Sequence, residues 1–240
     1  MYGIIGLPLE QSFSPGYFTA KFRQMGLDET YLRFPLTSIQ ELPKLLMDYP
    51  RLRGLNVTMP YKQEIIPYLH ELDQTAKAIG AVNTIHIKNG LLTGYNTDTI
   101  GFSNSLAGLM QPHHQKALVL GTGGAAKAVW HSLSQLGMPF LKVSRSREKG
   151  MCTYGQLTGE LMASHAVIIN ATPLGMLHDA DSCPPIPYQF VTDKHLAYDL
   201  IYTPEETLFM RKAAAMGALV KNGYDMLIGQ AEAAWQIWNP

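Results

Sequence analysis

The stretch KALVLGTGGAAKAVWHSLSQLG, residues 116–137, carries the strongest fold signal in the chain. Residues 116–120 read as a buried strand, a glycine-rich turn follows, and an alanine-rich helix runs up to Gly137. Gly121, Gly123 and Ala126 form the pattern G-x-G-x-x-A where the strand meets the helix. In this context the pattern is typical of dinucleotide binding, because glycine lets the backbone approach a pyrophosphate at the positive end of a helix. An ordinary tight turn is the alternative.

The end of the next predicted strand, residues 140–146, indicates which dinucleotide is bound. An NAD site usually has an acidic residue at this point, about 20 residues after the glycines, to hold the ribose 2′-hydroxyl. Here the sequence reads SRSREK, residues 144–149, and its first acid is Glu148. Arginine and small hydroxyls suit a 2′-phosphate, so Ser144, Arg145 and Ser146 favour NADP. A solvated basic loop is the alternative.

Strand and helix signals alternate along the whole chain. Further strands are expected within 2–7, 30–36, 54–57, 165–176, 194–202 and 218–223, and helices within 14–26 (with Ser14 as N-cap), 38–49, 98–110 and 205–217. Asn89-Gly90 between two alternating runs predicts a hairpin. A final helix over 224–239 has an apolar stripe of Tyr224, Leu227, Ala231, Ala234, Trp235 and Trp238, with Gln230 at its edge. The pattern predicts an α/β fold with mostly parallel sheets.

Lys62 and Asp98 are the candidate proton donor and its carboxylate partner. Pro60 fits the first position of a helix after the strand 54–57, which places Lys62 in the first helical turn. The positive end of the helix dipole disfavours a cation in that turn, and a nearby carboxylate would orient it. The alternatives are an ordinary surface lysine and an aspartate that only caps a helix.

Polar residues recur where the predicted strands end. Ligands of open α/β sheets bind beyond the carboxyl ends of the strands, so these residues together resemble a pocket for hydroxyl and carboxylate groups. Each one alone fits a cap or turn equally well. They are Ser12, Ser14, Asn56, Thr58, Asn83 and, at the far end of the chain, Gln230.

Composition limits the classes of function. The chain has 240 residues, 46% hydrophobic and 16% charged, with 19 basic and 19 acidic side chains. This is typical of a globular protein with one large domain or two small ones, and it gives no electrostatic argument for nucleic acid or a membrane as main partner. Cys152 and Cys183 have neither redox-motif nor zinc spacing, and neither a signal peptide nor a membrane span is apparent. We therefore expect a cytoplasmic protein without a metal.

Eight short stretches, in order along the chain, match one known family. They are SFSP (12–15), NVTMPYK (56–62), GAVNT (80–84), GYNTD (94–98), GTGGAA (121–126), NATPLGM (170–176), YDLIYTPEET (198–207) and NGYDMLIGQA (222–231). On these motifs the chain resembles the shikimate dehydrogenases over nearly its whole length. The resemblance implies the reversible, NADPH-dependent reduction of 3-dehydroshikimate to shikimate, in the biosynthesis of chorismate and aromatic amino acids.

The resemblance also implies two lobes and a set of site residues. The substrate lobe would comprise 1–100 with 223–240, and the Rossmann-type NADP lobe 101–222. Lys62 and Asp98 match the catalytic pair, which also contacts substrate. Other substrate positions are Ser12 and Ser14 for the carboxylate, Asn56, Thr58, Asn83 and Gln230 for ring hydroxyls, and Tyr202. Cofactor positions are Gly121, Thr122, Gly123, Gly124, Ala125, Ser144, Arg145, Ser146, Thr172, Met176, Ile201, Gly223 and Met226.

Two other functions stay open. An NAD-dependent quinate/shikimate dehydrogenase is one, although the missing acid after residue 143 argues against NAD. A non-catalytic dinucleotide-binding regulator is the other, against which the retained Lys62 and Asp98 argue. The chain departs from the family pattern at Thr122, where alanine is commoner, and at residues 144–146, which usually read Asn-Arg-Thr. We expect a small-molecule substrate and a monomer or homodimer.

Overall fold

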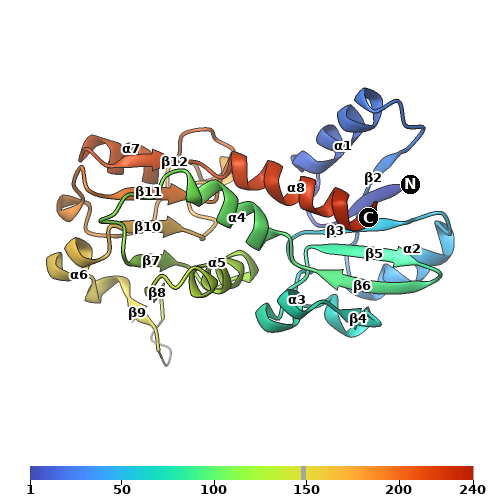
Figure 1. Ribbon diagram of the computed structural model, residues 1–240, viewed down its shortest axis with the longest axis horizontal. Helices are drawn as coiled ribbons and strands as arrows, with labels where there is room; N and C mark the ends of the chain where they lie inside the picture. The colour runs from blue at the N-terminus through green and yellow to red at the C-terminus, as the bar shows by residue number, and fades with distance from the viewer. Residues whose placement is uncertain (147–149, 240) are drawn as a thin grey trace. The chain divides into compact units, whose positions relative to one another are not determined.

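The computed structural model describes residues 1–146 and 150–239, and the chain forms two compact units (Figure 1). The first comprises Met1–Thr97 and the segment from Ala231 onward, and the second comprises Asp98–Gln230. Each unit has its own six-stranded sheet, and the predicted α/β class is confirmed. The assignment of substrate to 1–100 with 223–240 and of NADP to 101–222 stays a prediction, because compactness does not reveal what a unit binds.

The sheet of the first unit is mostly parallel with one antiparallel hairpin, as predicted. Its strands are β1 (Tyr2–Gly6), β2 (Tyr31–Pro35), β3 (Gly54–Val57), β4 (Glu71–Leu72), β5 (Thr84–Lys88) and β6 (Leu91–Tyr95), in the order β2-β1-β3-β5-β6-β4. The hairpin joins β5 to β6. Asn89 and Gly90 have φ values of 52° and 78°, the left-handed backbone that a two-residue hairpin turn requires.

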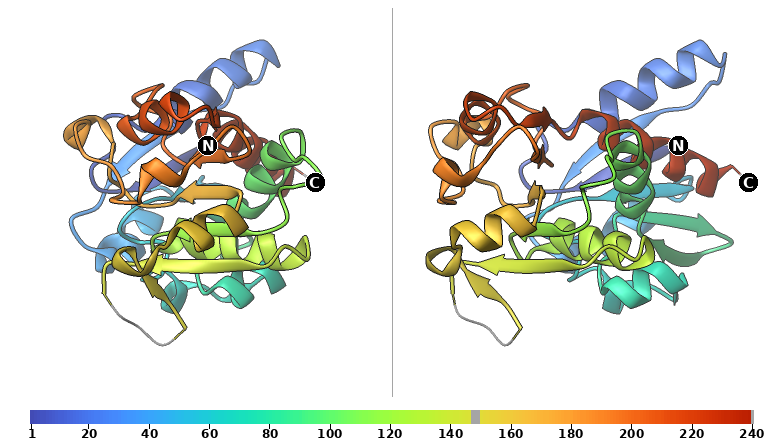
Figure 2. Two further views of the ribbon diagram at one scale, coloured as in Figure 1. Left: turned by 90° about the vertical axis from the view of Figure 1, so that its left-hand side faces the viewer. Right: turned by 60° about the vertical axis from the view of Figure 1, so that its left-hand side comes forward.

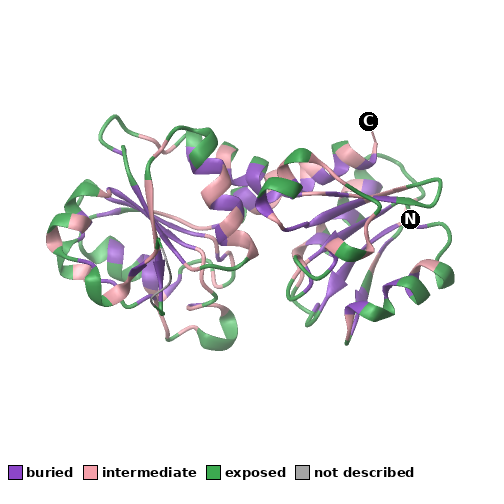
Figure 3. Cartoon of the chain, turned by 90° about the horizontal axis from the view of Figure 1, so that it is seen from below, coloured by how far each residue is buried: buried purple, intermediate pink, exposed green. Residues whose placement is uncertain are grey.

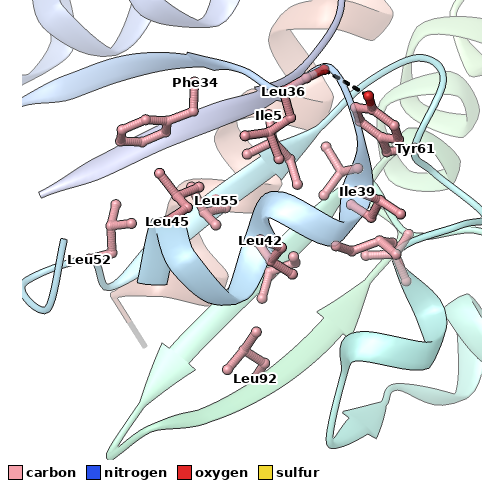
Figure 4. Close-up of a cluster of buried hydrophobic side chains, with 14 of the residues drawn as sticks. Ile5, Phe34, Leu36, Ile39, Leu42, Leu45, Leu52, Leu55, Tyr61 and Leu92 are labelled. Atoms are coloured by element: carbon pink, nitrogen blue, oxygen red, sulfur yellow. Dashed lines mark hydrogen bonds between the residues drawn. The ribbon is translucent and has the colours of Figure 1, made fainter. Parts of the chain in front are cut away.

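Helices cover both faces of this sheet. On one face, α1 (Phe13–Gln24) and the second half of α8 (Tyr224–Trp238) form an aromatic cluster of Tyr2, Phe18, Phe22, Tyr31, Trp235 and Trp238 with smaller apolar residues. On the other face, α2 (Leu42–Asp48) and α3 (Gln74–Ile79) pack over an aliphatic cluster that includes Ile5 and Leu55 (Figure 4). The hydroxyl of Tyr61 donates to the carbonyl of Leu36 at 2.7 Å at the edge of that cluster (Figure 4).

Two helix predictions need correction, one in each unit. Helix α1 begins at Phe13, so Ser12 and not Ser14 occupies the N-cap position. The extended backbone of Ser12 (φ −64°, ψ 129°) marks the end of the preceding turn, and Pro15 is then tolerated in the first helical turn. In α8, Tyr224 is 47% exposed and does not belong to the buried stripe, and Leu227 is half-buried. Met226, 7% exposed, fills the buried position instead.

The predicted helix after Pro60 is wrong. Residues 59–65 form successive turns that lead into a 3₁₀ helix, Ile66–Tyr68. The N–H of Ile66 bonds to the carbonyl of Gln63, and the carbonyl of Lys62 instead accepts the N–H of Val82 at 2.7 Å. A contact with a distant residue therefore takes the acceptor that an α-helix would have used. The dipole argument for Lys62 does not apply to this backbone.

The second unit is a parallel sheet with helices on both faces (Figure 2). Its strands are β7 (Ala117–Leu120), β8 (Phe140–Ser144), β9 (Cys152–Thr153), β10 (Val167–Asn170), β11 (Leu196–Asp199) and β12 (Leu219–Lys221), in the order β12-β11-β10-β7-β8-β9. One face packs on α4 (Asp98–Ala107), α5 (Gly124–Gln135) and the start of α8. The other packs on α6 (Gly159–Ser164) and α7 (Leu208–Ala215).

The central strands β1, β3, β7, β10 and β11 are buried along their whole length, the strands toward the sheet edges are partly exposed, and the outer sides of the helices are exposed (Figure 3). Short 3₁₀ helices connect other elements, at Ile39–Glu41, Tyr154–Gln156, Leu177–Asp179 and Tyr188–Phe190. Over the described ranges, no helix has both the length and the apolar character that a membrane crossing needs.

The packing of α8 on β3 generates a stability prediction. A Cβ added at Gly54 would lie 2.3 Å from Nε1 of Trp238, whose indole N–H donates to the carbonyl of Ile85 at 3.0 Å. Because the ring is held in place, Gly54→Ala should lower the free energy of unfolding by about 1–3 kcal/mol in urea titrations. Gly16→Ala is the matched control, since a Cβ there has nothing within 4 Å. It lies in α1 and should gain about 0.5–1 kcal/mol. Equal stability of the two variants would contradict the prediction.

Candidate active site

In the first unit, the predicted substrate residues gather at the carboxyl ends of β1 and β3. Ser12 and Ser14 open the helix that follows β1, and Asn56 and Thr58 lie at the end of β3, whose register pairs Asn56 with Ile4. Asn83 directly precedes β5 and lies beside the end of β3, because its carbonyl accepts the N–H of Val57 at 2.8 Å. Ser14, Asn56 and Asn83 are buried, whereas Ser12 and Thr58 are half-buried.

Asn56 is held by protein groups on both atoms of its amide. Its Oδ1 accepts the hydroxyl of Tyr31 at 2.6 Å, and its Nδ2 donates to the carbonyl of Asn83 at 3.4 Å and to Oγ1 of Thr84 at 3.3 Å. Burial raises the pKa of Tyr31 well above its usual range, and a hydrogen bond to Ser14 opposes this shift. Tyr31 is therefore a neutral donor that links Ser14 to Asn56.

Asn83 fixes the end of β6. Its Oδ1 accepts the backbone N–H of Thr97 at 2.8 Å, and its Nδ2 donates to the hydroxyl oxygen of Thr97 at 3.0 Å. Thr84 joins the same network by donating to Oδ1 of Asn83 at 3.1 Å. Because Thr97 directly precedes Asp98, this network sets where α4 begins.

The candidate catalytic pair is divided between the two units. Lys62 belongs to the first unit, and its side chain is half-buried. Asp98 is the first residue of α4 in the second unit and is 6% exposed. Two other predicted substrate residues, the half-buried Tyr202 and the 8% exposed Gln230, also belong to the second unit. The Nε2 of Gln230 donates to the carbonyl of Leu227 at 3.1 Å.

The glycine turn of the second unit lies where the strand order reverses. Gly121 has a φ of +112°, which favours glycine, and a Cβ there would lie 2.8 Å from the carbonyl oxygen of Ala171 and 3.2 Å from Cγ2 of Thr172. The turns after β7 and β10 are thus in contact. Helix α5 follows with Gly123 as its N-cap, and Thr122 and Gly123 are exposed, while Gly124 and Ala125 are half-buried. Open parallel sheets bind dinucleotides at this switch point.

The residues predicted to select NADP lie at the end of β8. Ser144 is buried and its Oγ accepts the N–H of Ser146 at 3.4 Å, while Arg145 and Ser146 are exposed. This arrangement leaves the guanidinium of Arg145 accessible to a ligand at the strand end. The rest of the predicted basic run, Arg147 and Lys149 with Glu148 between them, lies outside the described residues.

The other predicted cofactor residues follow β10, β11 and β12. Thr172 and Met176 are half-buried in the turn after β10, and Ile201 is 7% exposed after β11. The N–H of Gly223 donates to the carbonyl of Ile201 at 3.0 Å, and a Cβ at Gly223 would lie 2.1 Å from the carbonyl oxygen of Leu200. Only glycine permits this close approach. Met226 packs in the cluster that also contains Phe102 and Leu106.

Sequence reasoning missed several residues that organise these two regions. Asn170 and Asp199 are the last residues of β10 and β11, are fully buried and bond to each other, with Nδ2 of Asn170 donating to Oδ1 of Asp199 at 3.0 Å. Both were detectable, because a polar residue at the end of a buried strand was the signal used elsewhere. Tyr31 and Thr84 carried no such signal, since an aromatic or threonine in a strand is ordinary. Thr97 lies between β6 and α4, where a threonine is equally ordinary.

The comparisons with known proteins bear on the whole chain. Residues 4–85 match the family model described as the shikimate dehydrogenase substrate binding domain. A protein of Desulforamulus reducens named shikimate dehydrogenase (NADP(+)) is 37% identical, over 98% of this chain and 88% of that protein. The chain belongs to the shikimate dehydrogenase family.

Solved structures agree with this family assignment. The shikimate dehydrogenase of Aquifex aeolicus superposes with a TM-score of 0.88 at 36% identity, covering 99% of this chain and 91% of that one. The enzyme of Thermus thermophilus, solved in complex with NADP(H) and shikimate, also gives a TM-score of 0.88, at 31% identity and with 99% and 92% covered. The predicted family and fold are confirmed.

Three features of the second unit fit the general requirements of a dinucleotide site. A side chain at Gly121 would clash with the backbone of Ala171, the N-cap Gly123 leaves the start of α5 uncovered by a side chain, and Arg145 is exposed beside the turn. Metal binding has no comparable basis in the part of the chain that the structure describes. Within the described ranges, no three His, Cys, Asp or Glu side chains are grouped so that they could hold an ion.

Asp199 generates a prediction about pH and stability. Burial raises the pKa of its carboxyl from 3.8 to about 6, although hydrogen bonds from Thr207, Ile201 and Asn170 lower it. Between these two pH values the native state binds more protons than the unfolded chain, so this group makes stability fall as the pH rises. The total loss is about 3 kcal/mol, at 1.36 kcal/mol per pKa unit.

Urea unfolding from pH 4 to pH 7 measures this loss. Asp199→Asn keeps the shape of the side chain and removes its titration. The stability of the wild type relative to this variant should therefore decline across the window and level off above about pH 6. A difference that stays constant with pH would contradict the raised pKa.

Proposed function

We propose that the chain catalyses the reversible reduction of 3-dehydroshikimate to shikimate with NADPH. The observation that carries this proposal is the relationship, over nearly the full length, to enzymes named shikimate dehydrogenase (NADP(+)). The glycine turn at the switch point and the polar network at the strand ends of the first unit supply the two kinds of binding group that such a reaction needs.

The first unit would hold the substrate. Ser12 and Ser14 would bind its carboxylate, and the link from Ser14 through Tyr31 to Asn56 would fix the spacing between this group and the ring hydroxyls. Asn56, Thr58 and Asn83 would face those hydroxyls, together with Tyr202 and Gln230 of the second unit. A site built from buried, hydrogen-bonded side chains loses little entropy when it binds a small polar ring.

Lys62 and Asp98 would handle the proton. Lys62 would donate a hydrogen bond to the carbonyl oxygen that is being reduced, and would deliver or relay the proton to it, while Asp98 would orient the ammonium group. The carbonyl of Lys62 is tied to the N–H of Val82, so the backbone that carries this side chain is held against the strand edge of the first unit.

The second unit would hold NADP. Residues 121–125 would contact the pyrophosphate, Ser144, Arg145 and Ser146 the 2′-phosphate, and Thr172, Met176, Ile201, Gly223 and Met226 the nicotinamide half. When bound, this cofactor supplies the hydride for the reduction. The protein contributes position and exclusion of water. We further propose a cytoplasmic location and a monomeric or homodimeric state.

Initial-rate assays test the function as a whole. The purified chain should oxidise shikimate with NADP, and more slowly or not at all with quinate or with NAD. Comparable rates with quinate and NAD would favour the broader quinate/shikimate activity. Tight NADPH binding without turnover of either substrate would instead indicate a regulator and refute the enzyme proposal.

Lys62→Ala should lower kcat for shikimate oxidation by about 100-fold or more, with a smaller change in KM, because the proton acceptor is lost while the other binding groups remain. Lys77→Ala is the matched control, since Lys77 is an exposed lysine on α3 of the same unit. Steady-state kinetics of both variants measure kcat and KM for shikimate. A kcat close to that of the wild type in Lys62→Ala would remove this residue from the proton step.

Arg145→Ala should raise KM for NADP about 10-fold or more and leave KM for NAD unchanged, because a charge-assisted bond to the 2′-phosphate contributes about 1.5–3 kcal/mol. The exposed Arg211 on α7 provides the control Arg211→Ala. If KM rises equally for the two cofactors, Arg145 does not recognise the 2′-phosphate.

A further inference from the structure

Asp199 is a carboxylate in the interior of the second unit that accepts hydrogen bonds from neighbouring turns. It is 0% exposed, at the last position of β11. Its Oδ1 accepts Nδ2 of Asn170 and the backbone N–H of Ile201, both at 3.0 Å, and its Oδ2 accepts the hydroxyl of Thr207 at 2.7 Å. Two oxygens thus bind three donors from three separate segments.

Asn170 extends this connection to the turn after β10. Its Oδ1 accepts both the backbone N–H of Thr172, at 3.0 Å, and the hydroxyl of Thr172, at 2.7 Å. Its Nδ2 also donates to the carbonyl of Leu174 at 3.3 Å. The conformation of this turn is therefore determined by the amide of Asn170, whose orientation is in turn determined by Asp199.

The two turns held in this way border the switch point of the sheet. Thr172 lies against the glycine turn, since a Cβ at Gly121 would be 3.2 Å from its Cγ2. Ile201 continues the same edge after β11, which pairs with β10 in register from Val167–Leu196 to Asn170–Asp199. Asp199 thus bonds directly to Ile201 and, through Asn170, to Thr172, and these two residues border the region where an open parallel sheet binds its dinucleotide.

Burial of a carboxylate is unfavourable, and an apolar residue would fill the end of a buried strand with a smaller desolvation penalty. An apolar side chain could not accept the three hydrogen bonds that Asp199 accepts from Asn170, Ile201 and Thr207. Thr207 also serves two segments, because its hydroxyl donates to Asp199 and accepts the N–H of Met210 as the N-cap of α7. These hydrogen bonds fix the positions of the turns after β10 and β11 and of the start of α7.

We propose that Asp199 is a positioning residue for the nicotinamide half of the cofactor: through Asn170 and the N–H of Ile201 it holds the turns that carry Thr172 and Ile201. This inference rests on the proposed function, since it takes NADP as the ligand of the second unit. It assigns to Asp199 no contact with the cofactor or the substrate.

Calorimetric titration with two ligands tests the proposal. NADPH contains the whole cofactor, whereas adenosine 2′,5′-bisphosphate contains the adenine half and the 2′-phosphate without nicotinamide. Asp199→Ala should raise Kd for NADPH about 10-fold or more and leave Kd for the bisphosphate within about twofold. Asp199→Asn, which keeps an acceptor oxygen for Asn170 and Ile201, should restore most of the lost affinity. Asp193→Asn is the matched control on an exposed aspartate of the same unit.

Each other outcome decides against the proposal. Unchanged NADPH affinity in Asp199→Ala would show that the hydrogen bonds do not matter for binding. Equal losses for the two ligands would show general damage to the unit, and an Asp199→Asn variant as weak as Asp199→Ala would exclude hydrogen-bond positioning. If the wild type binds neither ligand, the proposed function fails and the inference fails with it.

A second pair of variants covers the case in which Asp199→Ala does not fold. The hydroxyl of Thr207 holds Oδ2 and with it the orientation of the carboxylate that Asn170 and Ile201 contact. Thr207→Val removes this donor, and Thr207→Ser keeps it. The valine variant should bind NADPH more weakly than the serine variant, with the same affinity of both for the bisphosphate. Identical NADPH affinities of the two variants would overturn the proposal.

Discussion

A buried strand that ends inside a protein leaves polar groups that water cannot reach, and both units meet this constraint with side-chain amides and carboxyls. Asn56 and Asn83 bind the strand ends of the first unit, and Asn170 and Asp199 those of the second. These side chains orient the turns that follow the strands. The same hydrogen bonds that satisfy the backbone therefore also arrange the candidate site.

The two units differ in what they place at their strand ends. In the first, the groups are side-chain hydroxyls and amides, which suit a small ring with many hydroxyls. In the second, Gly121 and Gly223 remove side chains altogether, since a Cβ at either position would overlap with the backbone of a neighbouring turn. A long, thin ligand with phosphates requires backbone that can be approached closely, and glycine is the residue that permits this.

Local patterns predicted the fold well, because they depend on neighbours in sequence. The Asn89-Gly90 turn and the junction of β7 with α5 are examples. The helix after Pro60 was predicted wrongly, since the carbonyl of Lys62 bonds to Val82, twenty residues away. Tyr31 was indistinguishable from a core aromatic, because its role depends on the position of Asn56 in space. The pairing of Lys62 with Asp98 stays a prediction.

Helix α8 begins in the second unit and ends in the first, and this division affects how the chain is made. Trp235 and Trp238, which leave the ribosome after all of the second unit, cover the face formed by Tyr2, Phe18 and Phe22. During synthesis all residues of the second unit therefore emerge before the first unit is complete, although synthesis begins with the first unit. From the emergence of residue 97 until that of Trp238, the aromatic face of the nascent chain is uncovered. Apolar surface exposed in this way favours aggregation.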